Sequence, residues 1–554
     1  MFPQWTEEIT ERYVKGEDQL GIQGAAQSYQ QYLVPGVITT TDRARYYSFY
    51  AWVLYRFITD PNSSRLLKDF RGDYFRKHEV AMILASFSHH KDADPLVGLV
   101  GSGINNNKAR QYWESGDPVS LDQDYFQNTL GGFGQYYRTS MDVMGIINEQ
   151  ERAGWVYRLT PRGRNLAEAY RDSIKITRYY SELDEKGELD YISHVDAQEL
   201  GEVGCICEEA LSQGKDFELL RETFFRFDQT GIDNPHVRRR LTLGVTLDLV
   251  RGGNGQINED DFRPALYLGE YSPDLKYEPS KELVSWVYRW KMVQIRQMYT
   301  FGLECLWAAF LYTLKNEING FTFDEFLESL SDKSSIDFEE DIDGYLNDLV
   351  NQFDISTEWK HAYSEFIEYA GLDFKDNEYR HYLNARGDRK NVSVLLESGL
   401  NILLTLFLRF YIKYLSKDRL WNELATQQRL PLNLYFNKLD NKLQNPKFKI
   451  GDFLRWIYSD FILGQHEYIA LEKLRYQEYD TFKFYYQDGR FYWPYHSRDA
   501  YEEPIRFASL RLFNTRSLLS DLGMIQKDEE GFLSLTATGE KYLNRILRER
   551  GDDN

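Results

Sequence analysis

The chain has 554 residues, of which 42% are hydrophobic, 16% aromatic and 27% charged, and its net charge is −20. This length exceeds a single hydrophobic core and predicts roughly two to four domains. The acidic balance excludes a protein that coats nucleic acid non-specifically, because such proteins present a basic surface. Three cysteines are typical of a reducing compartment, and the first residues lack a basic-then-apolar leader, so we expect a cytoplasmic protein.

The first two regions of the chain are predicted to be mainly helical. Residues 1–119 form an N-terminal helical region with aromatic runs such as "RARYYSFYAWVLYRF". In residues 120–178 a helix ends in "MGII", a polar stretch leads to the short strand "WVYRL", and another helix follows. Thr160 can cap that helix, with Pro161 at the favoured first position. The predicted order is therefore helix, hairpin, helix.

Residues 193–475 are predicted to form a helical middle domain. Its two most apolar runs are 284–316, with apolar residues on every side, and 395–415, and both carry charges such as Arg289 and Arg409. Charges at these depths argue against membrane spans. We therefore expect both stretches to be buried helices of a protein that does not enter a membrane.

The last region, residues 478–550, repeats the earlier order. A hairpin is expected around Asp488-Gly489, and then a helix ends in "LGMI", the strand "FLSL" follows, and Thr536 caps a closing helix. The shared phrase Leu-Thr-x-x-Gly indicates one folding unit used at both places. The predicted fold class is mainly α: a multidomain helical protein with two α+β modules and a packed helical middle.

The two modules resemble the end of a winged-helix domain. In that family a Leu-Gly-Met-Ile-like tetrad closes the recognition helix, the hairpin is the wing, and Leu-Thr-x-x-Gly starts a helix that packs on the core. The resemblance covers about 55 residues at each site, 120–176 and 501–550. It implies DNA binding or protein docking.

Arginines are the residues of these modules best suited to contact phosphates, which position a protein without reading sequence. The triplet Arg238, Arg239 and Arg240 is the densest basic run, although it could equally pair with the acidic segment 324–348. Acidic residues also surround the other arginines. The candidate DNA-binding residues are Arg138, Arg152, Arg158, Arg162, Arg164, Arg238, Arg239, Arg240, Arg506, Arg511 and Arg516.

Catalytic and metal-binding signatures are incomplete. Phosphate-loop and calcium-loop look-alikes lack essential ligands. Cys205 and Cys207 have no second cysteine pair and no histidine pair nearby in sequence, so we interpret them as buried small residues. A cryptic metal site of the nuclease kind is left open at His89, His90, Asp92 and Asp94. We expect no catalytic residue, no resident metal and no cofactor.

The layout, with such modules near both ends of an acidic helical chain, is loosely similar to kleisin-like accessory subunits of structural-maintenance-of-chromosomes ATPases. The chain departs from them because its first module begins near residue 120 and its middle is packed. The resemblance implies a DNA-associated scaffold subunit with a coiled-coil ATPase partner, and such subunits occur in bacterial defence against phages and plasmids. Two alternatives stay open: a winged-helix transcriptional regulator and a metal-dependent nuclease.

Overall fold

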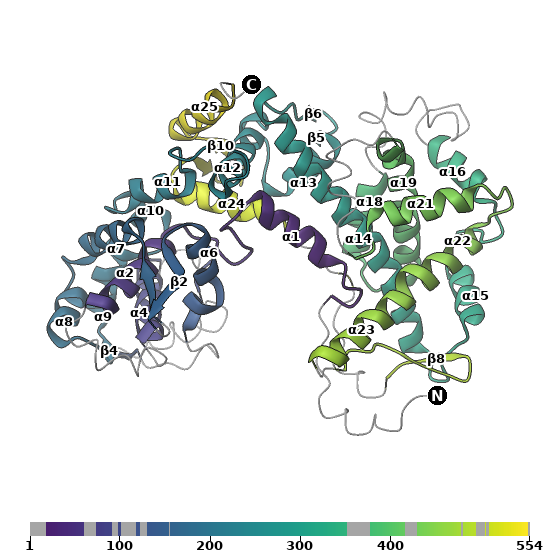
Figure 1. Ribbon diagram of the computed structural model, residues 1–554, viewed down its shortest axis with the longest axis horizontal. Helices are drawn as coiled ribbons and strands as arrows, with labels where there is room; N and C mark the ends of the chain where they lie inside the picture. Colours follow the sequence, from purple (N-terminus) through teal and green to yellow (C-terminus); the bar gives the residue numbers. More distant parts are fainter. Residues whose placement is uncertain are drawn as a thin grey trace. The chain divides into compact units, whose positions relative to one another are not determined.

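A computed structural model shows a mainly helical protein, as the sequence predicts (Figure 1). Among the described residues every sheet consists of two antiparallel strands. Because so small a sheet cannot form a core alone, helix packing supplies the core. The structure describes residues 18–59, 74–90, 98–100, 118–121, 130–153, 156–351, 377–415, 429–477, 480–494, 505 and 509–551.

The contacts divide the chain into two compact units, and both are discontinuous in sequence. Unit 1 comprises 1–29, 266–269 and 288–508, and unit 2 comprises 30–265, 270–287 and 509–554. Three helices cross a boundary between these segments: α1 (Gln23–Leu33), α13 (Phe262–Leu268) and α14 (Val284–Asn316). The division is coarser than the four predicted regions, and residues of the first and last predicted regions share unit 2.

Unit 2 contains both copies of the Leu-Thr-x-x-Gly phrase. Its helices are α2 (Tyr46–Thr59), α4 (Tyr74–His89), η2 (Phe133–Tyr137), α6 (Arg138–Val143), α7 (Pro161–Ile174), α8 (Arg178–Lys186), α9 (His194–Gly204), α10 (Glu208–Ser212), α11 (Phe217–Phe225), α12 (Pro235–Gly252), η3 (Glu259–Asp261), η4 (Lys281–Leu283), α24 (Arg511–Asp521) and α25 (Ala537–Gly551). Its strands are β1 (Val119–Ser120), β2 (Ile147–Ala153), β3 (Val156–Leu159), β4 (Tyr191–Ile192), β5 (Glu270–Ser272), β6 (Leu275–Lys276), β9 (Ile525–Lys527) and β10 (Leu533–Leu535).

The first copy of the phrase connects a hairpin to a helix. Gly145 turns the chain out of α6 with a φ of 71°, which favours glycine. Strands β2 and β3 then pair, and the Thr160 hydroxyl donates to the Gly145 carbonyl at 2.7 Å while accepting from the Gly163 N–H at 3.1 Å. Thr160 is thus the predicted cap of α7. We call residues 133–174 the first hairpin unit.

The second copy reproduces these bonds. Gly523 has a φ of 68° after α24, and strands β9 and β10 form the hairpin. The Thr536 hydroxyl donates to the Gly523 carbonyl at 2.8 Å and accepts from the Gly539 N–H at 3.1 Å. We call residues 511–551 the second hairpin unit. The repeated phrase therefore encodes one local structure at both places.

Unit 1 is a helical unit built around the long apolar helices that the sequence indicates. Residues 303–311 of α14 are all buried. Helix α14 meets α19 so closely that a Cβ on Gly399 would lie 2.9 Å from the Gly302 carbonyl oxygen. Its further elements are α15 (Phe323–Lys333), α16 (Ile342–Asn351), α18 (Asn377–Gly387), α19 (Val392–Leu415), α21 (Leu432–Leu443), α22 (Ile450–Ile457), η5 (Tyr458–Leu463), α23 (Gly464–Gln477), β7 (Tyr485–Gln487) and β8 (Arg490–Tyr492).

Two further sequence predictions hold in unit 1. Strands β7 and β8 pair across Asp488 and Gly489, whose φ angles are 51° and 81°, as a two-residue hairpin turn requires. Among the described residues one stretch, Val392–Phe410 of α19, is long and apolar enough for a membrane span, but 78% of it is buried. It contains Arg409, which forms a buried ion pair with Glu378 at 2.6 Å. This is the pattern of a core helix.

Candidate nucleic-acid interface and candidate metal centre

The helix that precedes the hairpin is covered differently in the two hairpin units. In the first hairpin unit, Gln135 and Thr139 are exposed on η2 and α6. In the second unit, α24 packs against α12 and α10, and its Leu512, Thr515 and Leu518 are buried. A helix that reads a DNA groove needs an exposed face. The first hairpin unit has such an exposed face on η2 and α6, whereas α24 of the second hairpin unit is packed inside unit 2.

The segment that precedes α2 provides part of this cover. The Arg43 guanidinium and the Ala44 N–H donate to the buried Asp521 carboxylate at 2.6 and 2.9 Å. Nearby, the Asn514 amide bonds to Asp42. Residues near the two ends of the sequence therefore form one part of the unit 2 interior.

The predicted arginines of the second hairpin unit are engaged inside unit 2. Arg511 is buried and donates to the Val37 carbonyl at 3.0 Å, and burial lowers its pKa to about 10. Arg516 forms an ion pair with Glu259. Arg506 lies outside the described residues. These contacts give Arg511 and Arg516 structural roles.

The arginines of the first hairpin unit lie nearer the surface. Arg158 on β3 and Arg164 on α7 are exposed, and Arg162 is 28% exposed. Arg138 donates to the Tyr157 hydroxyl at 3.2 Å and is half-buried. The side chain of Arg152 lies outside the described residues. Four predicted residues are thus positioned on or beside one hairpin and the helix after it.

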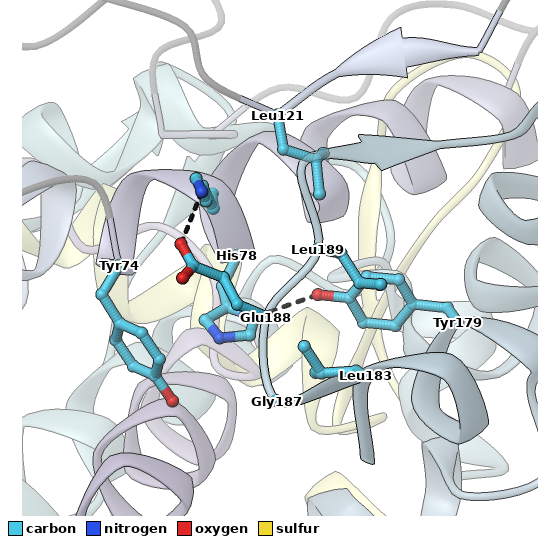
Figure 2. A pocket seen from close by; sticks show the side chains of 9 residues that line it. Tyr74, His78, Leu121, Tyr179, Leu183, Gly187, Glu188 and Leu189 are labelled. Carbon is cyan, nitrogen blue, oxygen red and sulfur yellow. Dashed lines mark hydrogen bonds and ion pairs between the residues drawn. The ribbon is translucent and has the colours of Figure 1, made fainter. Parts of the chain in front are cut away.

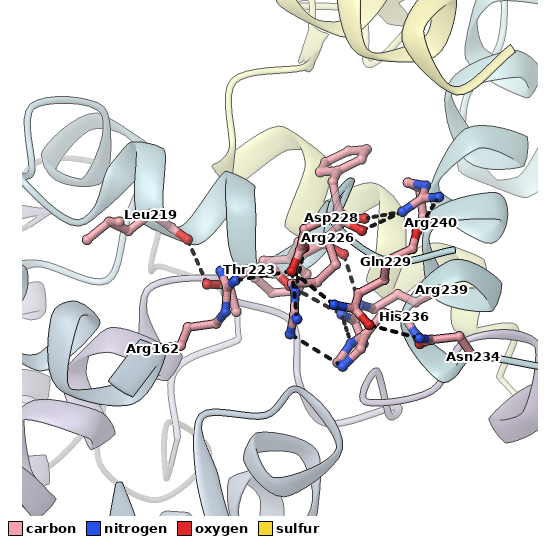
Figure 3. A network of polar contacts seen from close by, with 12 residues as sticks. Arg162, Leu219, Thr223, Arg226, Asp228, Gln229, Asn234, His236, Arg239 and Arg240 are labelled. Atoms are coloured by element: carbon pink, nitrogen blue, oxygen red, sulfur yellow. Dashed lines mark hydrogen bonds and ion pairs between the residues drawn. The ribbon is translucent and has the colours of Figure 1, made fainter. Parts of the chain in front are cut away.

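Arg162 belongs to a wider arginine cluster between α7, α11 and α12 (Figure 3). Arg226, in the left-handed region at φ 45°, ends α11 and holds Asp228 through two bonds of 2.9 and 3.0 Å. Arg162 lies 4.0 Å from the same carboxylate. Burial, followed by the charge of Arg226, lowers the pKa of Arg162. The pKa of His236 is lowered to about 3 by burial and then by Arg239 and Arg226, so this ring is neutral.

The predicted arginine triplet on α12 donates mainly to backbone carbonyls, among them those at the C-terminal end of α11. Arg239 is fully buried, and burial lowers its pKa to about 9. Arg240 is buried and lies 3.4 Å from Glu549, and Arg238 lies over the Tyr32 ring at 4.3 Å. The carbonyls that receive their N–H groups belong to Tyr32, Pro35, Thr223, Phe224, Phe225, Arg226, Gln229 and Asp233. A buried guanidinium used in this way presents no face to a phosphate.

A small pocket lies where α4, α8 and the turn after α8 meet (Figure 2). It is lined by Tyr74, His78 and Tyr179 among others, and its volume of about 10 Å³ suits one water molecule. His78 Nδ1 and the Tyr179 hydroxyl are 2.9 Å apart. Burial lowers the pKa of His78 to about 3. The pocket is too small for an organic ligand.

The fold brings two histidines of the predicted metal candidate to a cysteine. One ligand atom from each of His89, His90 and Cys207 lies within 4.8 Å of the other two. His89 ends α4, and Cys207 caps α10 by accepting the Ala210 N–H at 3.4 Å. Asp92 and Asp94, the other half of the predicted set, lie outside the described residues. Sequence reasoning missed Cys207 because 116 positions separate it from His90.

Hydrogen bonds and burial shift the pKa values of two groups at this cluster. The hydrogen bond with the Cys205 thiol, followed by the Ala210 N–H and the His90 and His89 rings, lowers the pKa of Cys207 to about 5 despite its burial. Burial, with the nearby Asp521 charge, raises the pKa of Glu208 to about 7. A cysteine beside two imidazoles is a ligand set that suits a soft divalent metal.

Comparisons with known proteins give no relative: no protein-family model matches the chain, nor does any curated protein or solved structure.

Proposed function

We propose that the chain is a non-enzymatic, DNA-associated scaffold subunit of a multiprotein complex. The observation that carries this proposal is the arginine cluster at the start of α7. Arg162 stands beside Arg226 and Arg239, with Asp228 as a carboxylate that Arg162 and Arg226 share. A phosphate near Arg162 would relieve the repulsion between these arginines, and the positive end of the α7 helix dipole lies at the same place and favours an anion.

The surface of the first hairpin unit extends this basic site. Arg158 lies on the hairpin and Arg164 one position beyond Gly163 on α7. In the winged-helix resemblance these places correspond to the wing and the helix that packs behind it. We propose that this face holds the sugar-phosphate backbone through Arg158, Arg162 and Arg164, with Arg138 on the preceding helix α6.

In this proposal the chemistry of the complex belongs to a partner. The resemblance to kleisin-like subunits suggests a coiled-coil ATPase, and an antiviral or anti-plasmid defence system of the cytoplasm as the setting. The acidic net charge of −20 favours docking to a protein over extensive DNA coverage.

The transcriptional-regulator alternative asks more of the second hairpin unit. It needs an exposed DNA-reading helix in each hairpin unit, whereas α24 of the second hairpin unit packs against α10 and α12. A regulator that uses the first hairpin unit alone is compatible with the same arginines. The scaffold and regulator hypotheses differ in whether a protein partner accompanies the chain.

The DNA contact is tested by fluorescence anisotropy of a labelled duplex over a series of salt concentrations. We expect Arg162→Ala/Arg164→Ala to weaken binding and to reduce the salt slope by about one to two, since each lost phosphate contact removes about one. The matched control is Lys541→Ala/Arg548→Ala, which removes the same charge from exposed positions of α25. Equal losses in both variants would reduce the effect to net charge and refute the proposed site.

The scaffold role is tested by purifying the tagged chain from its native cells with and without nuclease. A stoichiometric partner that survives nuclease treatment is expected. Recovery of the chain alone, or loss of all companions after DNA digestion, would refute the scaffold role and leave the regulator in place.

A further inference from the structure

We propose that His89, His90 and Cys207 bind one zinc-class divalent cation. Their ligand atoms already lie within 4.8 Å of one another, although the residues come from two elements far apart in sequence. In a tetrahedral zinc site the ligand atoms sit about 2.0–2.3 Å from the metal, so a set this close needs little rearrangement.

The second observation is an unpartnered nitrogen. The Nε2 atom of His90 is buried and has no hydrogen-bond partner among the described residues. A buried polar atom without a partner is costly and uncommon in folded proteins. Coordination through Nε2 would satisfy this nitrogen, because a neutral imidazole binds zinc through its unprotonated nitrogen.

The cysteine is held in place before any metal binds. Cys207 is 3% exposed, its Sγ accepts the Ala210 N–H, and its own N–H bonds to the Cys205 Sγ at 3.4 Å. These bonds fix the thiol at the first turn of α10. A ligand fixed by outer hydrogen bonds loses less conformational entropy when it binds a metal.

The donor set decides the class of metal. One sulfur and two imidazoles match zinc and cobalt, whereas magnesium and calcium require oxygen ligands. Glu209 lies beside the set, with a carboxylate oxygen 3.6 Å from His89 Nε2 and a side chain that is 72% exposed. Solvent therefore reaches this side, and we assign the fourth position to water with Glu209 next to it.

The metal would join the end of α4 to the start of α10. Helix α4 packs on α9, which precedes Cys205 and Cys207, and α10 packs on α24. Because α10 packs on α24, a cation at this junction would also stabilise the contact between the middle of unit 2 and the second hairpin unit. This inference stands apart from the DNA-associated role and is independent of Arg162 and Arg164.

The test uses the full chain without a histidine tag, purified from zinc-supplemented medium. Mass spectrometry of the metal content is expected to give about one zinc per chain, as a single site requires. After removal of the metal, titration with Co²⁺ should produce the thiolate-to-cobalt charge-transfer band and the strong visible absorption of tetrahedral cobalt. Bound metal should also protect Cys207 from alkylation in the peptide map.

The variants are Cys207→Ser and His90→Ala, with Cys305→Ser as the matched control because Cys305 is a fully buried cysteine of unit 1. Both site variants should lower cobalt affinity at least about tenfold, and the control should not. If a site variant does not fold, the cobalt spectrum and the alkylation map of the unmodified chain decide. Absence of the sulfur band, or equal metal loss in Cys305→Ser, would overturn the proposal.

Discussion

The Thr160 hydroxyl accepts the Gly163 N–H at 3.1 Å, and the glycine is needed as much as the threonine. A Cβ on Gly163 would lie 2.1 Å from the Ile146 carbonyl oxygen. The second hairpin unit repeats this relationship, since a Cβ on Gly539 would lie 2.2 Å from the Met524 carbonyl oxygen. In both units the helix after the hairpin thus lies against the backbone that leaves the preceding helix.

This close approach predicts that Gly163→Ala and Gly539→Ala are each destabilising by about 2–4 kcal/mol, since a backbone oxygen cannot move aside as a flexible side chain does. Equilibrium urea unfolding measures the change. Gly24→Ala is the control, because nothing lies within 4 Å of its new Cβ, and it should be neutral or stabilising by up to about 1 kcal/mol. A Gly163→Ala protein as stable as the control would contradict the packing described here.

The buried ion pair of unit 1 predicts a large effect of removing one partner. The Arg409 guanidinium donates to both Glu378 oxygens, and the Tyr267 hydroxyl donates to the same carboxylate at 2.6 Å. Arg409→Met leaves a buried carboxylate without its cation and should cost about 3–5 kcal/mol. Arg455→Ala breaks the exposed pair with Asp324 and should cost less than about 1 kcal/mol. Similar losses in the two variants, measured by thermal unfolding, would contradict this prediction.

His466 predicts acid sensitivity of unit 1. Its Nε2 accepts the Lys483 N–H at 3.0 Å, so Nδ1 carries the proton and donates to the Gln19 carbonyl at 3.0 Å. Burial lowers the pKa of this ring to about 3, from 6.5. As the pH falls from 6.5 towards 3, His466 is protonated in the unfolded chain but stays neutral in the folded chain. The free energy of unfolding therefore decreases over this range.

At pH 5 this cost should reach about 2 kcal/mol relative to pH 8, since one pKa unit corresponds to about 1.4 kcal/mol. In His466→Gln, whose amide keeps a donor and an acceptor, the difference in unfolding free energy between pH 8 and pH 5 should shrink by that amount. Other histidines stay the same in both proteins, so an unchanged difference would show that His466 is not responsible.

Arg239 tests whether the α12 triplet has a structural role. Its guanidinium donates to the carbonyls of Thr223, Phe224 and Pro35, a geometry that lysine cannot reproduce. Arg239→Lys should be destabilising by about 2–3 kcal/mol, whereas Arg164→Lys at an exposed position should stay within about 0.5 kcal/mol. The salt slope of DNA binding should be unchanged in Arg239→Lys if the protein is folded, and a reduced slope would restore Arg239 to the DNA contact.

Local structure could be predicted from the sequence, but the burial of an element by residues distant in sequence could not. The Thr160 and Thr536 caps and the Asp488-Gly489 turn follow from residues a few positions apart. The burial of α24 depends on partners as distant as Arg43, and no pattern within α24 identifies them. The Cys207 cluster was missed for the same reason, because periodicity and spacing report neighbours in sequence and this site joins α4 to α10.

The bond between Arg43 and Asp521 has a consequence for how the protein is made. A ribosome releases Arg43 early, but Asp521 follows only after the whole stretch 288–508 of unit 1 has been synthesised. During that interval the nascent unit 2 lacks α24, and the apolar residues that α24 covers stay open to solvent or to a chaperone. Unit 1 can complete its folding first. A premature stop at residue 509 would therefore leave all residues of unit 1 attached to an unfinished unit 2, which proteases would be expected to degrade.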